Sequence, residues 1–421
     1  MGVGLLFVFA AWVLRFSFGY PICRTDEANW IDIARQLDRG VSWPVSGPAF
    51  IEAARWIARQ FDAAHTSAIP WLGVLGVFFA VCALVWGYRK FNLSSPMVVL
   101  TALALSSYFW APLMEARPQQ WGQILVFLGV ICGWQWLHRK GGWAFFLIVP
   151  SVTITHILSH AILAFLCGML VIADYVEKRP LTKRHLGLLL AVLMSMGIYL
   201  WPRGPYAAML NDLEHNQMKR LLVSGPYAAV LFLLGIAVFI WGQRKWHWRP
   251  SWTDAVATGL VRRSTAAGLS VVSLVFTALV MQAYLLPADA WLPYGGSWLR
   301  FLFFQSGNLI FAGLFVVGIH RLVAGLQSKQ LDANMGRLLI WVLVALSLLS
   351  VLSIIVSWWL LHTNWFLRIL NYGIFFAAIV AALGIGRVAK SWPAIAKYAL
   401  LGIGVVASIL AVLRPPQLLG C

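Results

Sequence analysis

The sequence predicts an all-α, polytopic membrane protein with about 13 transmembrane helices. Three observations support this prediction. Of the 421 residues, 61% are hydrophobic and only 11% are charged, whereas soluble domains carry about a quarter charged residues. Apolar stretches long enough to cross a bilayer recur along the whole chain. The Lys and Arg residues are concentrated in alternate connections between these stretches, as in membrane proteins with many spans.

A membrane-crossing helix needs roughly 17–25 predominantly apolar residues. Thirteen stretches approach this requirement within one integral membrane domain over residues 1–421: 2–20, 68–88, 94–113, 120–137, 142–156, 158–175, 186–202, 226–243, 265–286, 298–319, 338–360, 369–386 and 396–413. The fifth and sixth stretches are almost continuous. Pro150 and the polar residues from Thr153 to His160 are predicted to separate them, and the fifth is short for a full crossing.

The charge distribution predicts the sidedness of these helices. With the N-terminus in the cytoplasm, the cytoplasmic connections hold 19 Lys and Arg against 4 Asp and Glu, and the outer connections hold 12 against 10. With Arg15 inside the first span, the net charges of +15, +2 and +1 sum to the formal +18. This is the positive-inside distribution. It predicts a C-terminus outside the membrane and argues against a nucleic-acid partner.

The first outer connection, residues 21–67, contains two amphipathic patterns. Apolar residues recur at helical spacing in both, at Trp30, Ile33, Ala34 and Leu37 and then at Phe50, Ala53, Ala54, Ile57 and Phe61. Gly40 is a natural end for the first pattern, and Pro48 opens the second. Both are too short to span a bilayer, so we expect two helices that lie along the membrane surface.

Two adjacent carboxylates, Asp26 and Glu27, follow directly on the first span. Asp before a helical pattern commonly caps the helix, so this pair has a purely structural explanation as well as a catalytic one. A carboxylate near apolar walls can have a tuned pKa and act as a general base. Glu115 ends the third span on the same side of the membrane, with Arg117 close by. A surface ion pair is the simpler explanation there, and a role in a site is the alternative.

Further outer polar residues are candidates for binding a phosphate or another substrate group. His156 and His160 are one helical turn apart and could face a single ligand, although polarity at a helix end explains them more simply. Arginine offers a forked set of donors that suits phosphate, and the outer cations considered are Arg15, Arg117, Lys219, Arg220 and Arg368. No metal motif accompanies them, so the sequence assigns no metal ligand and leaves a divalent metal open as a cofactor.

Together these features resemble the GT-C superfamily of membrane glycosyltransferases. The resemblance rests on the N-in first span ending in Asp26-Glu27, the outer loop with two helices, the second acidic position at Glu115 and the thirteen spans. It is specifically to the aminoarabinose transferase and protein O-mannosyltransferase branch. The topological likeness covers the whole chain and the motif likeness residues 1–175. By resemblance, residues 1–175 hold the catalytic half, and the helices of 186–413 bind substrate and lipid.

The resemblance implies an inverting transfer of a sugar from a polyprenyl-phosphate donor at the non-cytoplasmic membrane face. Asp26 would be the catalytic base, Glu27 its neighbour and Glu115 the second acidic position. The expected acceptor is an envelope lipid or glycan, because no appended soluble domain is expected. The expected location is a bacterial inner membrane with a periplasmic site. The identity of the sugar and of the acceptor stays open.

Two other classes of protein are alternatives. A polymerase or ligase of the O-antigen type also uses polyprenyl-linked glycans, but it relies on Arg and His in large late outer loops, and here the loop at 203–225 is modest. A transporter would place ionisable residues at mid-membrane and broken helices in matched halves. The sequence shows no matched halves, and ten of the fourteen carboxylates lie on the outer side.

Overall fold

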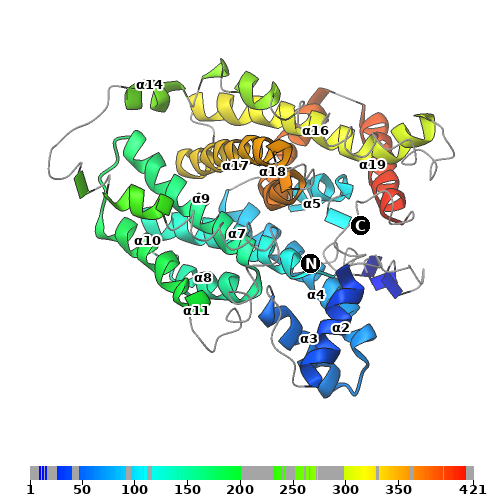
Figure 1. The fold of residues 1–421 in the computed structure, drawn as a ribbon. Coiled ribbons are helices and arrows are strands. Elements are labelled where there is room, and N and C mark those ends of the chain that lie inside the picture. Colours follow the sequence, from blue (N-terminus) through cyan, green and yellow to red (C-terminus); the bar gives the residue numbers. More distant parts are fainter. Residues whose placement is uncertain are drawn as a thin grey trace. The chain divides into compact units, whose positions relative to one another are not determined.

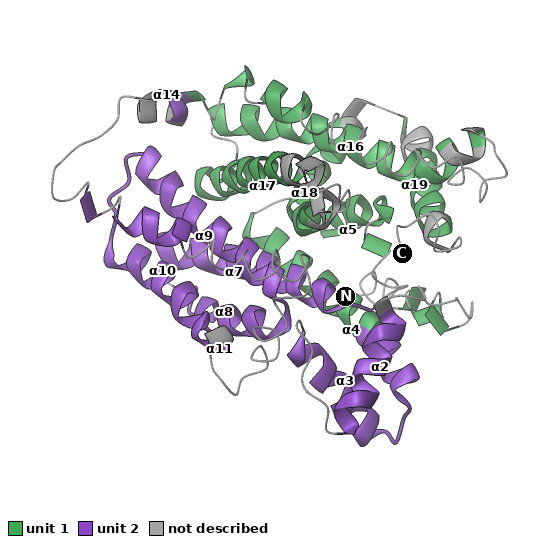
Figure 2. Ribbon diagram, in the orientation of Figure 1, with its two compact units in different colours: residues 1–26, 73–115, 259–421 green, residues 27–72, 116–258 purple. Residues whose placement is uncertain are grey.

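The computed structural model is helical throughout its described part, which contains no β-strand (Figure 1). It describes residues 9–10, 12–13, 15–16, 26–39, 47–91, 96–107, 109–110, 116–139, 141–200, 231–238, 241–242, 252–259, 262–264, 266–271, 273, 298–328, 331–359, 365–391 and 393–413. Two compact units divide the chain: Met1–Asp26, Gly73–Glu115 and Gly259–Cys421 form the first, and Glu27–Leu72 and Ala116–Thr258 form the second (Figure 2).

Within the described residues, four helices are long and apolar enough to cross a membrane: His65–Lys90, Ile157–Val176, Leu302–Gln327 and Ala333–Ser353. Shorter apolar helices lie at Ala144–Thr155, Asn371–Arg387 and Tyr398–Leu410. Each of these helices falls on a predicted span. The chain is therefore an integral membrane protein, and the total of thirteen spans and their sidedness remain predictions.

In the first unit, α16 (Trp298–Gln327) packs against α18 (Trp365–Ser391) and α19 (Ala394–Leu413). The helix α17 (Ala333–Trp359) and the short helix α5 (Pro96–Ala104) also pack on α18. The chain leaves helical geometry after α5, and side chains satisfy the backbone groups that this exposes. Ser408 donates to the Leu105 carbonyl at 2.6 Å, and the Asn308 amide oxygen accepts from the Ser107 N–H at 3.0 Å. Such compensation is required wherever a helix breaks within an apolar environment.

The second unit contains the two predicted amphipathic helices, α2 (Asp26–Asp38) and α3 (Pro48–Gln60). Their apolar faces pack against one another and against the start of α4 (His65–Lys90), in a core built from Ile31, Ala34, Leu37, Phe50, Ile51, Ala54, Ile69, Leu72 and Ala116. The helices themselves confirm the prediction from periodicity. Much of the apolar surface that we expected to lie on the membrane is buried inside the protein instead.

The rest of the second unit is a group of packed helices: α7 (Pro118–His138), α8 (Ala144–Thr155), α9 (Ile157–Val176) and α10 (Lys183–Ser195), followed by the single turn α11 (Gly197–Leu200). The separate helix α14 (Trp252–Gly259) follows further along the chain. Pro150 lies inside α8 and does not end it. The break predicted between the fifth and sixth spans is at His156, whose backbone is extended at φ −162°.

Candidate functional site

Several of the predicted site residues lie around the N-terminal turn of α7. Arg117 is the N-cap residue of this helix, with extended backbone, and Pro118 occupies the first helical position. Proline is well suited to that position, because the N–H it lacks would have no partner inside the helix. The dipole of this 21-residue helix has its partial positive charge at the N-terminus, beside Arg117. The guanidinium of Arg117 adds a full positive charge there.

Glu27 connects the start of α2 to this turn. Its side chain is completely buried, and Oε2 accepts a hydrogen bond of 3.0 Å from the backbone N–H of Ala116. A buried carboxylate is costly unless such donors satisfy it. The bond fixes the first turn of α2, which begins at Asp26, beside the residue that follows Glu115 in the sequence. The Asp26 side chain and the whole of Glu115 lie outside the described residues.

Gly47 connects the start of α3 to the same turn. Its φ of +78° is in the left-handed region that favours glycine. A Cβ atom at this position would lie 2.5 Å from Cγ of Pro118 and 3.3 Å from the carbonyl oxygen of Thr155. The start of α3, the start of α7 and the end of α8 therefore meet here without room for a side chain.

His156, at the junction of α8 and α9, approaches α7 at Gly122. A Cβ atom at Gly122 would collide with the Ser159 side chain and lie 3.3 Å from Cβ of His156. His156 is the N-cap residue of α9, and its Nδ1 accepts from the Ser159 N–H at 3.3 Å. The neutral ring therefore carries its proton on Nε2. Arg117 and His156 thus occupy the N-cap positions of two helices that pack closely together.

The structure gives His160 a different environment from that of His156. His160 is completely buried, and its Nε2 lies 2.9 Å from the hydroxyl of Ser195 on α10. Ser195 in turn donates to the carbonyl of Val192 at 2.7 Å. His156 bonds within its own first helical turn, whereas His160 joins α9 to α10. The expectation that both rings face one ligand thus finds no support in these contacts.

The remaining predicted residues fall elsewhere or outside the described part. Arg15 is buried in the first unit and has at least one interaction partner. Arg368 lies in α18, and its side chain is not described. Lys219 and Arg220 are outside the described residues, as is the predicted interfacial helix at 203–225.

Two polar clusters in the second unit were not predicted. One is centred on Asp38 at the end of α2, whose carboxylate lies 2.5 Å from Nε2 of His65 and 2.8 Å from Nε of Arg55. The hydrogen bond to His65 lowers the pKa of the Asp38 carboxyl against an opposing effect of burial, and Arg55 lowers it further. The cluster joins α2, α3 and α4. The sequence signal was limited to charged residues on the polar faces of two amphipathic helices.

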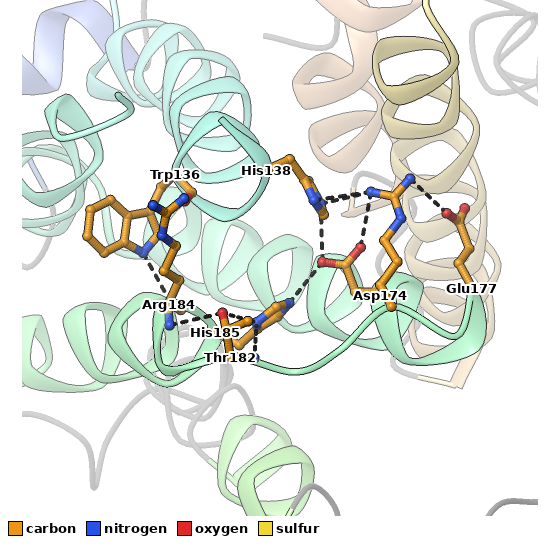
Figure 3. Close-up of polar contacts among 8 residues, drawn as sticks. Trp136, His138, Asp174, Glu177, Thr182, Arg184 and His185 are labelled. Atoms are coloured by element: carbon orange, nitrogen blue, oxygen red, sulfur yellow. Dashed lines mark hydrogen bonds and ion pairs between the residues drawn. The ribbon is translucent and has the colours of Figure 1, made fainter. Parts of the chain in front are cut away.

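The second cluster surrounds Asp174, which is completely buried near the end of α9 (Figure 3). Its Oδ2 lies 2.8 Å from Nε2 of His185 and 3.1 Å from Nε2 of His138, and Arg179 lies 3.5 Å from Oδ1. The N–H of Thr182 donates to Nδ1 of His185, so this ring is neutral and donates to Asp174 through Nε2. The cluster joins the ends of α7, α9 and α10 on the predicted cytoplasmic side. An acidic residue within an apolar stretch was its only sequence signal.

The arrangement around α7 suits an anion. Backbone N–H groups at a helix N-terminus and a nearby guanidinium favour phosphate or carboxylate. The described residues contain no group of three or more His, Cys, Asp and Glu placed to hold a metal ion. Of Asp26, Glu27 and Glu115, the structure describes the side chain of Glu27 alone, and this side chain already accepts from a backbone N–H.

Comparison with known proteins gave matches at the level of structure alone. No protein-family profile and no curated protein sequence matches the chain. Two similar solved structures are ArnT from Cupriavidus metallidurans bound to undecaprenyl phosphate and the same protein in the apo state. Identity is 13% in both cases, TM-scores are 0.40 and 0.39, and the alignments cover 93% of this chain and 79% and 78% of those chains.

Proposed function

We propose that this protein is an inverting glycosyltransferase of the GT-C type, which moves a sugar from a polyprenyl-phosphate donor to an envelope lipid or glycan. The observation that carries the proposal is the bond from buried Glu27 to the Ala116 N–H. It holds the acidic motif at 26–27 beside the N-terminus of a long helix suited to phosphate. A base and an anion site side by side are what transfer from a phosphate donor needs.

In the proposed reaction, the acceptor hydroxyl oxygen attacks the anomeric carbon of the donor sugar. Asp26 takes the hydroxyl proton as general base. The bond between the anomeric carbon and the phosphate oxygen breaks, and the polyprenyl phosphate leaves with the electron pair. Attack from the opposite face inverts the configuration at the anomeric carbon. In this scheme Glu27 is a positioning residue that orients the first turn of α2.

The leaving phosphate acquires charge as the bond breaks, so positive groups placed at it stabilise the transition state. Arg117 and the N-terminus of α7 are proposed for this role, with His156 donating through Nε2. Arg15, Lys219, Arg220 and Arg368 remain proposed additional phosphate contacts, and Glu115 a proposed second acidic residue. The lipid tail would reach the site laterally from the bilayer, at the non-cytoplasmic face of a bacterial inner membrane.

The test is transfer in vitro with purified protein, a panel of polyprenyl-phosphate sugars and extracted envelope lipids and glycans, with and without a chelator. Asp26→Asn should abolish transfer while the protein still binds undecaprenyl phosphate. Asp32→Asn is the matched control, because Asp32 is an exposed residue on the same helix whose ion-pair partner among the described residues is the nearby Arg35, at 3.3 Å. The control should transfer at the wild-type rate.

Unchanged transfer by Asp26→Asn would refute the catalytic assignment. Wild-type protein that transfers no sugar from any donor would instead favour the polymerase, ligase or transporter alternatives. Arg117→Gln tests the anion site separately, because it should weaken binding of undecaprenyl phosphate in the absence of any acceptor.

A further inference from the structure

The helices α8 and α10 pack against each other, and both expose large apolar side chains. On α10 the exposed apolar residues are Leu186, Leu190 and Met194, which recur one helical turn apart. On α8 they are Leu147 and Ile154, and Trp143 is exposed just before that helix. Trp143 is 68% exposed, Leu147 74% and Met194 77%. In an integral membrane protein such a surface faces lipid or another protein.

A fixed arginine lies at the start of this apolar surface. Nη1 of Arg184 donates to the carbonyl oxygens of Trp136 and Arg139, both at 3.1 Å, and the guanidinium lies over the Trp136 ring at 5.6 Å. Trp136 donates in return from Nε1 to the Arg184 carbonyl at 3.1 Å (Figure 3). Guanidinium has five N–H donors. Those on Nε and Nη2 of Arg184 make no hydrogen bond to a described residue and are available to a ligand.

The surroundings of Arg184 are positively charged. Lys183 precedes it and is exposed, Arg139 lies at the end of α7, and the N-terminus of α10 adds the positive end of its dipole. The acidic residues of this region, Asp174 and Glu177, are both ion-paired with Arg179, at 3.5 and 3.2 Å. The charge at Arg184 is therefore complementary to an anion.

Aromatic rings lie between the cationic end and the apolar surface. The rings of Trp136 and Trp143 meet at 4.6 Å between centroids, and Trp136 and Phe146 meet at 4.9 Å. Tryptophan is enriched at the level of lipid headgroups, where one side of the ring is apolar and the other is wet. The order of cation, tryptophan and aliphatic side chains follows that of a phospholipid from its phosphate to its acyl chains.

The length of the surface matches one leaflet. From Leu186 to Met194 the helix advances by about 12 Å, at about 1.5 Å per residue. Half of a hydrocarbon core of about 30 Å is about 15 Å. Trp136 and Gly122 are separated along α7 by fourteen residues, or about 21 Å, so the cationic end of this surface is distinct from the candidate functional site.

We propose that the C-terminal end of α7 and the N-terminal ends of α8 and α10 form a binding site for an anionic phospholipid of the cytoplasmic leaflet. The phosphate is bound by Arg184 with support from Lys183 and Arg139, and the acyl chains lie along α8 and α10. The proposal does not depend on the glycosyltransferase reaction. It differs from ordinary lipid contact in one measurable respect, a preference for negatively charged headgroups.

The experiment is native mass spectrometry of the full-length protein in detergent, titrated with phosphatidylglycerol or with phosphatidylcholine of the same acyl chains. Wild type should bind phosphatidylglycerol preferentially. Lys183→Gln and Arg184→Gln should each weaken that binding about fivefold, the effect of one cation near an anionic lipid surface. Binding of phosphatidylcholine should not change. The matched control is Arg262→Gln, an exposed basic residue in the other unit that is also predicted to be cytoplasmic.

Because Arg184 also holds two carbonyl groups, its variant is checked by thermal unfolding, and Lys183→Gln repeats the test without disturbing those bonds. Equal binding of the two lipids by the wild type would overturn the proposal. An equal loss in Arg262→Gln would also overturn it, because the effect would then be one of net charge. A stable dimer that excludes lipid from α8 and α10 would show that a second copy covers this surface, and would overturn it too.

Discussion

At the scale of single residues, the two members of the acidic motif differ: Glu27 has a structural role, and Asp26 is the proposed catalytic base. Glu27 is buried and hydrogen-bonded to Ala116, while Asp26 opens the same helix. Glu27→Ala removes the acceptor and leaves a buried N–H without it, which costs about 1–3 kcal/mol. The midpoint of thermal unfolding in detergent should fall accordingly. Glu27→Gln retains an acceptor oxygen and should lose less stability and keep transfer. A folded but inactive Glu27→Gln protein would instead give Glu27 a direct part in the chemistry.

Asp38 provides a prediction of pH dependence. Its folded-state pKa is lowered, first by the hydrogen bond to His65. Its stabilising contribution is therefore complete above the unfolded carboxyl pKa of about 3.9 and is lost as pH falls through the lower folded pKa. Asp38→Asn should be less stable than wild type at pH 6. Since the side chain is 40% exposed, solvent screening should limit the difference to less than about 1 kcal/mol.

The measurement is the unfolding midpoint of wild type and Asp38→Asn between pH 6 and pH 3. The gap between them should narrow below about pH 4, where the unfolded carboxyl begins to take up its proton. The exposed residue Asp32 provides the control, Asp32→Asn. A gap that widens on acidification would contradict the assigned direction of the pKa shift.

At the scale of elements, Gly47 decides how α3 meets α7 and α8. Gly47→Ala places a methyl group 2.5 Å from Pro118 and keeps a left-handed φ of +78°. The backbone conformation alone costs about 1–2 kcal/mol, and the collision adds to it, so both stability and the proposed transfer should fall. The control is Gly402→Ala in α19, where a Cβ meets nothing within 4 Å.

The expected changes in stability of the two glycine variants differ in sign as well as in size. Alanine is favoured over glycine in a helix interior by roughly 0.5–1 kcal/mol, so Gly402→Ala should leave the unfolding midpoint unchanged or raise it. Unfolding midpoints of the two variants in the same detergent give the comparison. Equal stability of Gly47→Ala and wild type would show that the start of α3 is not packed as described.

At the scale of the whole molecule, the predicted topology places the start of α4 outside the membrane and the start of α10 in the cytoplasm. In a background without the five native cysteines, Ala64→Cys before α4 should react with a membrane-impermeant maleimide in intact spheroplasts. Lys183→Cys at the start of α10 should react only after permeabilisation, because positive charge accumulates on the cytoplasmic side. Both positions are exposed. The reverse pattern would invert the topology, and with it the proposed side of the reaction.

Much of the fold follows from the sequence because helix formation in a membrane depends on local properties. Length and hydropathy predicted α4, α7, α9, α16 and α17, and helical periodicity predicted α2 and α3. The predicted spans 142–156 and 158–175 place the break between α8 and α9 beside His156, where the structure has it. Pro150, which was predicted to contribute to the break, lies inside α8, because a proline within an apolar helix is tolerated where neighbouring helices satisfy the freed backbone group.

The sequence by itself determined that this is a helical membrane protein, because burial in lipid requires apolar stretches and internal backbone hydrogen bonds. It also revealed the acidic motif after the first predicted span. Only the tertiary structure decided that Glu27 is a buried acceptor, that His156 and His160 have separate partners, and that Asp174 gathers two histidines and an arginine. These contacts join residues as far apart as Glu27 and Ala116. Their free energies depend on distance and desolvation in the folded protein, which no local pattern of residues specifies.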